Sequence, residues 1–201
     1  ILDQDGELII GVANMALYDE VTPAAIIPLL PEHPQAVMVD ANFPQETLVA
    51  IAGRLSNDCC LYATGTSTQK VHRLALLMNR LDALVLNRAE ACELTGKMGT
   101  VDELAIILSA SLRAHAPVLV SDGAGVAALA AGGKVISSPP PEITLANANG
   151  AGDVMAAAFF SLCLDRALGP PNIAVMPKEI LDDMLADALV AGANFAAGNA
   201  V

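Results

Sequence analysis

The chain has 201 residues, 54% of them hydrophobic, which is enough to bury a sizeable core. Its formal net charge of −12 excludes nucleic acid and anionic membranes as main partners, because both would repel it. No uninterrupted apolar stretch reaches the roughly 18 residues that a membrane-spanning helix needs, so we expect none.

Cysteine and histidine are too scattered to suggest a metal site. They show no paired ligand spacing, which argues against zinc and against a His-centred triad. Three of the cysteines lie in apolar runs, so we expect reduced thiols and a cytoplasmic protein. The residues in question are Cys59, Cys60, Cys92, Cys163, His33, His72 and His115.

Five strand-like runs alternate with helical patterns, at residues 8–12, 36–39, 59–63, 83–86 and 118–121. The first four are continuous apolar runs, which is typical of parallel strands covered on both faces. One intervening helix begins with a capping box, Thr100 and Glu103. This βαβα order predicts one α/β domain over residues 1–201. Its sheet should be doubly wound and mostly parallel, with helices on both faces and functional sites at the C-terminal strand ends.

Two further segments look like connections. Residues 137–141 are expected to be an extended link into the glycine-rich loop that follows, and residues 168–177 a loop before the last helix.

The fourth strand-like run leads directly into a helix that carries Asn87 and Glu90. These two residues are three apart, so on a helix they project to one side. Oxygen ligands of this kind hold hydrated Mg²⁺ through its water molecules. The alternative is a capped surface helix, in which Asn87 caps and Glu90 completes a reciprocal box.

Residues 117–129 have the pattern of a strand, a turn and a second strand. The turn contains Ser121, Gly123 and Gly125, and its Asp-Gly pair is a strong hairpin signal. A β-turn with no ligand would have the same sequence.

The segment 147–153 places glycines at the start of an apolar helix. Glycine lets backbone N–H groups turn toward a ligand, and a helix N-terminus attracts anions, so the N–H groups of Gly150, Ala151 and Gly152 can hold phosphate oxygens. Asp153 would stand beside that anion and accept the proton of an attacking hydroxyl, as phosphoryl transfer requires. The alternative is that Asp153 only caps the helix.

These motifs resemble those of the ribokinase-type (PfkB) sugar and nucleoside kinases. The run Asn147-x-Asn149-Gly150-Ala151-Gly152-Asp153 is similar to the family signature Asp/Asn-x-Thr-Gly-Ala-Gly-Asp, with Asn149 in the place of threonine. The segment at Asn87 and Glu90 resembles the family's Asn-x-x-Glu motif. The turn at Ser121 resembles its Thr-x-Gly-x-x-Gly hairpin, with Gly125 one residue early.

The resemblance implies a kinase that uses ATP and Mg²⁺. It implies that Asp153 is the catalytic base and that the N–H groups of Gly150, Ala151 and Gly152 form the anion hole. It assigns Asn87 and Glu90 to the metal and places ATP between the turn at residues 121–125, the Gly150 loop and the last helix. The cofactor-binding positions that it implies are Asn87, Ser121, Gly123, Gly125, Asn149 and Asn194, the last near the adenine; a helix amide that faces neighbouring backbone is the alternative for Asn194.

The substrate branch that the chain most resembles is pseudouridine kinase. The resemblance rests on residues 37–42, on residues 62–70 and on Asn147. In that branch a strand ends in a Pro-Val-Ser-x-x-Lys turn; Ser67 and Lys70 keep this spacing here, while Gly65 and Thr66 replace the Pro-Val pair. Lys70 is expected to approach the nucleotide phosphates, with a solvated surface lysine as the alternative.

Family members extend further at the N-terminus, where substrate-contacting glycines and a small β lid lie. The resemblance therefore implies a ribokinase-like fold without its N-terminal part and lid, and we expect a shortened form rather than a natural minimal kinase. Two functions stay open: an ATP-dependent kinase acting on a sugar or nucleoside, or a catalytically silent nucleotide-binding relative. Asp153 favours the kinase, because a carboxylate beside an anion site repels phosphate unless a metal or proton transfer offsets the cost. A homodimer is an open alternative to a monomer.

Overall fold

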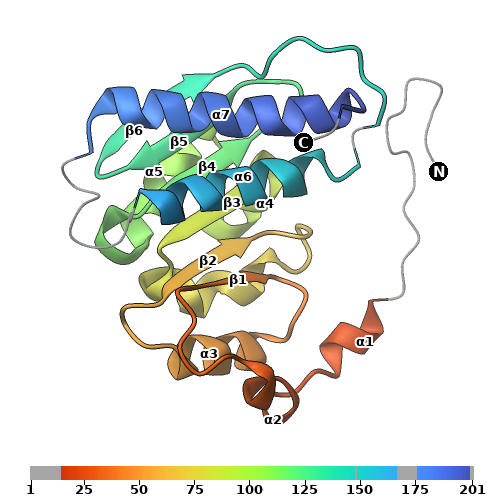
Figure 1. The fold of residues 1–201 in the computed structure, drawn as a ribbon, viewed down its shortest axis with the longest axis vertical. Coiled ribbons are helices and arrows are strands. Elements are labelled where there is room, and N and C mark those ends of the chain that lie inside the picture. Colours follow the sequence, from red (N-terminus) through yellow and green to blue (C-terminus); the bar gives the residue numbers. More distant parts are fainter. Residues whose placement is uncertain (1–14, 148, 167–175, 200–201) are drawn as a thin grey trace.

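The computed structural model describes residues 15–147, 149–166 and 176–199. They contain one six-stranded sheet with helices packed against it (Figure 1). The strands lie side by side in the order in which they occur in the chain. The first four pair in parallel, and the last two continue the sheet in antiparallel hairpins. The strands are β1 (Ala36–Asp40), β2 (Cys60–Thr64), β3 (Ala83–Asn87), β4 (Val118–Ser121), β5 (Ala127–Ala131) and β6 (Lys134–Ser138).

Helices cover both faces of this sheet. Crossovers between successive parallel strands are right-handed, so a sheet that grows in one direction places its connecting helices on one face. These helices are α3 (Gln45–Arg54), the 3₁₀ helix η2 (Val71–Arg80), α4 (Arg88–Thr95) and α5 (Val101–Ser111). The opposite face, in front in Figure 1, is covered by α6 (Ala151–Asp165) and α7 (Lys178–Ala196). Short helices complete the described elements: α1 (Ala16–Asp19), α2 (Pro23–Ile26), η1 (Ile27–Leu29) and η3 (Arg113–His115).

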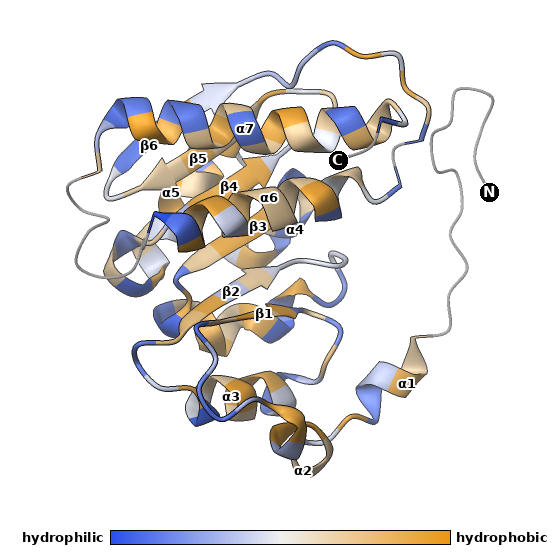
Figure 2. Ribbon diagram, in the orientation of Figure 1, coloured by the Kyte–Doolittle hydropathy of each residue, from blue (hydrophilic) through white to orange (hydrophobic). Residues whose placement is uncertain are grey.

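The predicted α/β fold with a mostly parallel sheet and helices on both faces is confirmed, and the apolar runs explain why. The described strands follow chain order in one direction, without the reversal of strand order that the predicted doubly wound sheet would have. All five residues of β5 and the first four of β3 are buried, as strands covered on both faces should be. Figure 2 shows hydrophobic residues along the central strands and mixed colouring on the helices, whose inner sides complete the core. The predicted strand at residues 8–12 lies outside the described residues, as does nearly all of the predicted loop at 168–177.

Strand β6 occupies part of the segment that was expected to be only an extended connection. It pairs with β5 through a two-residue turn, Gly132 and Gly133, in which both residues have positive φ (57° and 79°). Such a turn matches the twist of a hairpin and favours glycine at both positions. The Gly-Gly pair was therefore the signal for this strand.

A buried ion cluster lies just before β3, at the opposite end of the sheet from the C-terminal strand ends. The Asp82 side chain is only 2% exposed and accepts the backbone N–H of Leu61 at 2.9 Å. Its oxygens also lie 3.0 Å from Arg80 and 3.6 Å from Arg113. The carboxylate is thus compensated by two cations and one hydrogen bond, as a buried charge must be.

Within the described ranges, each helix is too short or too polar to cross a bilayer.

Candidate functional site

Two clefts open where the parallel strands end. The first, the strand-end cleft, has a volume of about 590 Å³. It lies between the C-terminal ends of β1 to β4 and the start of α6, and Met15 also lines it, so it brings together residues from six separate segments. Its lining residues are Met15, Asp40, Asn42, residues 64–67, Lys70, residues 85–87, Glu90, Ser121, Gly150, Gly152, Asp153 and Met155.

The second cleft, the helix-side cleft, has a volume of about 640 Å³ and lies between the turn after β4, the chain before α6 and the helix α7. Its walls are mostly apolar. The lining residues are Ser121, Gly123, Ala124, residues 140–143, Leu145, Ala151, Gly152, Met155, Leu189, Gly192, Ala193 and Ala196. Ser121, Gly152 and Met155 line both clefts, so the two meet at the start of α6.

The start of α6 presents backbone N–H groups to this junction. Gly150 is the N-cap residue, with φ of +90°, and its carbonyl accepts the first intrahelical hydrogen bond from Val154 at 3.0 Å. The N–H groups of Ala151, Gly152 and Asp153 therefore precede the helical ladder, and none has a partner among the described residues. Three free donors at a helix N-terminus form an anion-binding site.

Asp153 is the third residue of α6 and lines the strand-end cleft. Its side chain is exposed and makes no hydrogen bond or ion pair within the described part of the chain. The helix has no side-chain cap, so Asp153 is not engaged in the capping bond that is its alternative role. The carboxylate is free to accept a proton from a group bound in the cleft.

Asn87 and Glu90 form the reciprocal capping box at the start of α4. The Glu90 N–H donates to Asn87 Oδ1 at 2.9 Å, and the Asn87 N–H donates to Glu90 Oε2 at 3.0 Å. Both residues also line the strand-end cleft, so capping and ligand binding do not exclude one another at this position.

Glu90 is a buried carboxyl group, only 5% exposed. Burial raises its pKa, and the two hydrogen bonds from Asn87 act in the opposite direction. No cation pairs with it in the described ranges, so its charge is compensated by hydrogen bonds alone. Gly65 closes over it, since a Cβ at that position would meet the Glu90 carboxyl carbon at 2.5 Å.

These oxygen atoms fit a hydrated Mg²⁺ ion. Glu90, Asn87 and Asp153 place carboxylate and amide oxygens around one cleft, and such ligands suit Mg²⁺ bound through its waters. Among the described residues no three His, Cys, Asp or Glu side chains gather closely enough to cage a metal ion. A cation beside Glu90 would also compensate its buried charge.

The turn after β4 contributes to both clefts. Ser121 lines both, and Gly123, with φ of +59°, lines the helix-side cleft. Gly125 lines neither; its N–H donates to the Asp122 carbonyl at 2.8 Å and closes the turn.

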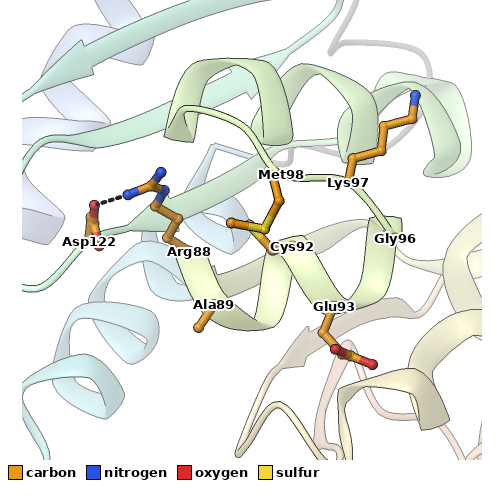
Figure 3. A pocket seen from close by; sticks show the side chains of 8 residues that line it. All are labelled: Arg88, Ala89, Cys92, Glu93, Gly96, Lys97, Met98 and Asp122. Atoms are coloured by element: carbon orange, nitrogen blue, oxygen red, sulfur yellow. Dashed lines mark hydrogen bonds and ion pairs between the residues drawn. The ribbon is translucent and has the colours of Figure 1, made fainter.

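A third cleft, of about 660 Å³, lies on the outer surface of α4 (Figure 3). Within it, Arg88 faces Asp122 at 3.2 Å and donates from Nε to the Gly99 carbonyl. Arg88 thus ties the start of α4 to the turn after β4, next to Asn87 on one side and Ser121 on the other. None of the predicted site residues lines this cleft.

Lys70 reaches the strand-end cleft from the loop after β2. Its Nζ donates to Asn42 Oδ1 at 3.2 Å. Asn42 in turn donates to Asp40, from its backbone N–H and from its side-chain amide, both at 2.9 Å. Lys70 is thus an anchored lysine and not a freely solvated one.

Besides Gly125, two predicted residues lie outside both the strand-end cleft and the helix-side cleft. Asn149 is exposed, and its N–H donates to Asn147 Oδ1 at 2.9 Å, which shapes the loop. Asn194 is exposed on α7, although Ala193 and Ala196 beside it line the helix-side cleft.

The sequence patterns indicated no role for Gly192, and they indicated Asp40 and Asn42 only as part of the segment 37–42. A Cβ at Gly192 would lie 3.1 Å from the Ala151 carbonyl, so glycine there lets α7 approach the start of α6. The signal was the small residues Ala188, Gly192 and Ala196, spaced four apart on one helical face. Asp40 and Asn42 follow a predicted strand, and the rule that sites gather at strand ends indicates them.

The matching family model is that of the pfkB family carbohydrate kinases, which covers residues 21–196. The chain belongs to this family of sugar and nucleoside kinases. No curated protein matches its sequence significantly.

Solved structures of kinases share the fold. A carbohydrate kinase from Agrobacterium tumefaciens is 24% identical, with a TM-score of 0.67 over 96% of this chain and 59% of that one. Adenosine kinase of Anopheles gambiae, in complex with P1,P4-di(adenosine-5) tetraphosphate, is 16% identical, with a TM-score of 0.68 over 88% and 56%. Aminoimidazole riboside kinase of Salmonella enterica, with aminoimidazole riboside and an ATP analog, is 16% identical, with a TM-score of 0.66 over 90% and 62%. The chain thus spans about three fifths of the length of these relatives.

Proposed function

We propose that this chain is the nucleotide-binding and catalytic part of a kinase domain that moves the γ-phosphoryl group of ATP to a hydroxyl of a sugar or nucleoside. The observation that carries the proposal is the junction of the two clefts. There, three N–H groups at the start of α6 that have no partner among the described residues lie beside the carboxylate of Asp153. An anion site next to a proton acceptor is what phosphoryl transfer requires.

ATP is assigned to the helix-side cleft. Its apolar walls suit a purine ring, and Ser121 and Gly123 offer a turn beside which the phosphates can pass toward Gly152. Two of the structural relatives carry an adenosine tetraphosphate or an ATP analog, which supports a nucleotide ligand. Because the chain has a net charge of −12, the phosphates must be held by local donors against an unfavourable overall field.

The acceptor is assigned to the strand-end cleft, with its hydroxyl at Asp153. As that hydroxyl attacks the γ-phosphorus, Asp153 takes its proton, the bond between the γ-phosphorus and the β–γ bridging oxygen breaks, and ADP leaves. The N–H groups of Ala151 and Gly152 stabilise the charge on the transferred group. Glu90 and Asn87 would hold Mg²⁺ through its waters, and this ion supplies neutralisation of phosphate charge when bound.

Pseudouridine is the acceptor that we favour. The proposal rests on the branch-like segments at 37–42 and 62–70, most of whose polar residues line the strand-end cleft. A silent nucleotide-binding relative is the second candidate, because Asn149 replaces the threonine of the signature. The free carboxylate of Asp153 favours the kinase.

The test is phosphoryl transfer in the intact protein. ATP, Mg²⁺ and one acceptor at a time (pseudouridine, ribose or adenosine) are mixed, and the phosphorylated product is followed by ³¹P NMR. We expect product with at least one acceptor and the fastest transfer to pseudouridine. ATP binding by calorimetry without transfer to any acceptor would favour the silent relative, and transfer to ribose or adenosine alone would overturn the pseudouridine assignment.

A further inference from the structure

Asn42 occupies the centre of a polar network at the end of β1. Its side-chain NH₂ group donates to Asp40 Oδ2 at 2.9 Å, and its side-chain oxygen accepts from Lys70 Nζ at 3.2 Å. The backbone is fixed as well, because its N–H donates to Asp40 Oδ1 at 2.9 Å and its carbonyl accepts from Arg73 at 2.6 Å. Arg73 is itself held by an ion pair with Asp19 at 2.7 Å.

This arrangement depends on the two ends of an amide. Asparagine offers donors on one side and an acceptor on the other, so it can stand between a carboxylate and an ammonium group and satisfy both. An aspartate at position 42 would repel Asp40, and an apolar residue would leave Lys70 without its anchor. Asp40, Asn42 and Lys70 all line the strand-end cleft, as do Gly152 and Asp153.

A lysine side chain is ordinarily mobile and loses considerable rotamer freedom when it is fixed. Asn42 holds the Lys70 side chain through one of the three N–H donors of its ammonium group, which leaves two Lys70 donors for an anion in the cleft. The cleft that receives them is the one in which an acceptor hydroxyl and the γ-phosphoryl group must meet.

We infer that Asn42 is a positioning residue that holds the Lys70 ammonium group for the γ-phosphoryl group in transfer. This inference rests on the proposed function and goes beyond it, since it assigns Asn42 the task of holding another side chain, Lys70, in place. Because the γ-phosphate is present in ATP and absent from ADP, the network should distinguish the two nucleotides.

The test is a double-mutant cycle read out as the ATP and ADP dissociation constants in the intact protein. Lys70→Met should weaken ATP binding about ten- to a hundredfold, in line with the loss of a charge-assisted hydrogen bond, and leave ADP binding unchanged. Asn42→Ala should weaken ATP binding about three- to tenfold, because Lys70 is still present but its side chain must lose rotamer freedom when ATP binds. In the Lys70→Met background, Asn42→Ala should have no further effect beyond about twofold.

Two controls accompany the cycle. Lys134→Met removes another hydrogen-bonded lysine, whose Nζ donates to the Met176 carbonyl and which lines neither cleft, and should change neither dissociation constant. Asn42→Leu, similar in size to asparagine, replaces Asn42→Ala if circular dichroism shows that the latter is unfolded.

Three results overturn the inference. If Asn42→Ala weakens ATP binding and ADP binding equally, Asn42 has only a structural role. The same holds if Asn42→Ala weakens ATP binding as much in the Lys70→Met background as in the wild type. If Lys70→Met leaves ATP affinity unchanged while the wild type binds ATP, the inference fails and the proposed function stands. If the folded wild type binds neither nucleotide, both fail.

Discussion

The close approach of Gly65 to Glu90 predicts that a glycine-to-alanine substitution lowers the free energy of unfolding at position 65, whereas the same substitution at position 53 raises it. A Cβ at residue 65 would stand 2.5 Å from the Glu90 carboxyl carbon and 2.9 Å from a methyl group of Leu86. Ordinary contact begins at 3.4 Å, so Gly65→Ala forces the carboxyl group back by about 0.9 Å. That group accepts the Asn87 N–H at 3.0 Å, and a retreat of this size takes the bond beyond hydrogen-bond range.

The size of the effect follows from these contacts. Loss of a hydrogen bond to a buried charged group costs about 1.5–3 kcal/mol. Alanine restricts the unfolded chain more than glycine, which offsets about 0.5–1 kcal/mol. The free energy of unfolding should therefore fall by about 0.5–2.5 kcal/mol, and Tm by about 1–10 °C for a chain of this size.

The assay is thermal and urea unfolding of the variant beside a matched control. Gly53→Ala lies near the end of α3, with no atom within 4 Å of the added Cβ, and should stabilise the protein by about 0.5–1 kcal/mol through helix propensity. Gly65→Ala in a Glu90→Ala background should cost less than in the wild type, because the carboxyl group is gone. If Gly65→Ala is as stable as the wild type, the packing argument is wrong.

Two further predictions concern buried charges. Burial raises the pKa of Glu90 above its ordinary value of 4.5. The folded protein is therefore more stable at low pH, where Glu90 is protonated, and it loses this stability as the pH rises through the raised pKa of the folded state. Glu90→Gln does not titrate and keeps a capping acceptor, so without Mg²⁺ its Tm relative to the wild type should rise as the pH increases above about 4.5. A difference that does not vary with pH would contradict this. Asp82→Ala leaves Arg80 and Arg113 without their carboxylate and the Leu61 N–H without its acceptor, so urea unfolding should show a loss of about 3–5 kcal/mol. A loss below about 1 kcal/mol would mean that the cluster is solvent-screened.

Local signals were readable from the sequence because each needs only a few neighbouring residues. The box formed by Thr100 and Glu103 forms as predicted, with its two bonds at 3.3 and 2.9 Å. The same holds for Asn87 and Glu90, where the pattern also allowed a metal role that stays a prediction. The Asp-Gly turn after β4 likewise joins two antiparallel strands.

Contacts between distant segments were not readable in this way. The bond between Lys70 and Asn42 joins residues 28 apart, and depends on β1 and β2 lying side by side in register. The close approach of Gly192 to the start of α6 depends on how two helices pack, which no local pattern specifies. Asn194 illustrates the same limit, since a family position fixes its place on α7 but not the direction of its side chain.

The most direct test of the account is single-turnover phosphoryl transfer by Asp153→Asn in the intact protein, with the acceptor that the wild type uses. Asparagine keeps the shape of the side chain but cannot take the hydroxyl proton, so the transfer rate should fall by about 10² to 10⁴ while ATP affinity changes little. Asp165→Asn, at the far end of the same helix, is the matched control and should transfer at the wild-type rate. Transfer by Asp153→Asn as fast as by the wild type would contradict the central claim that Asp153 is the base.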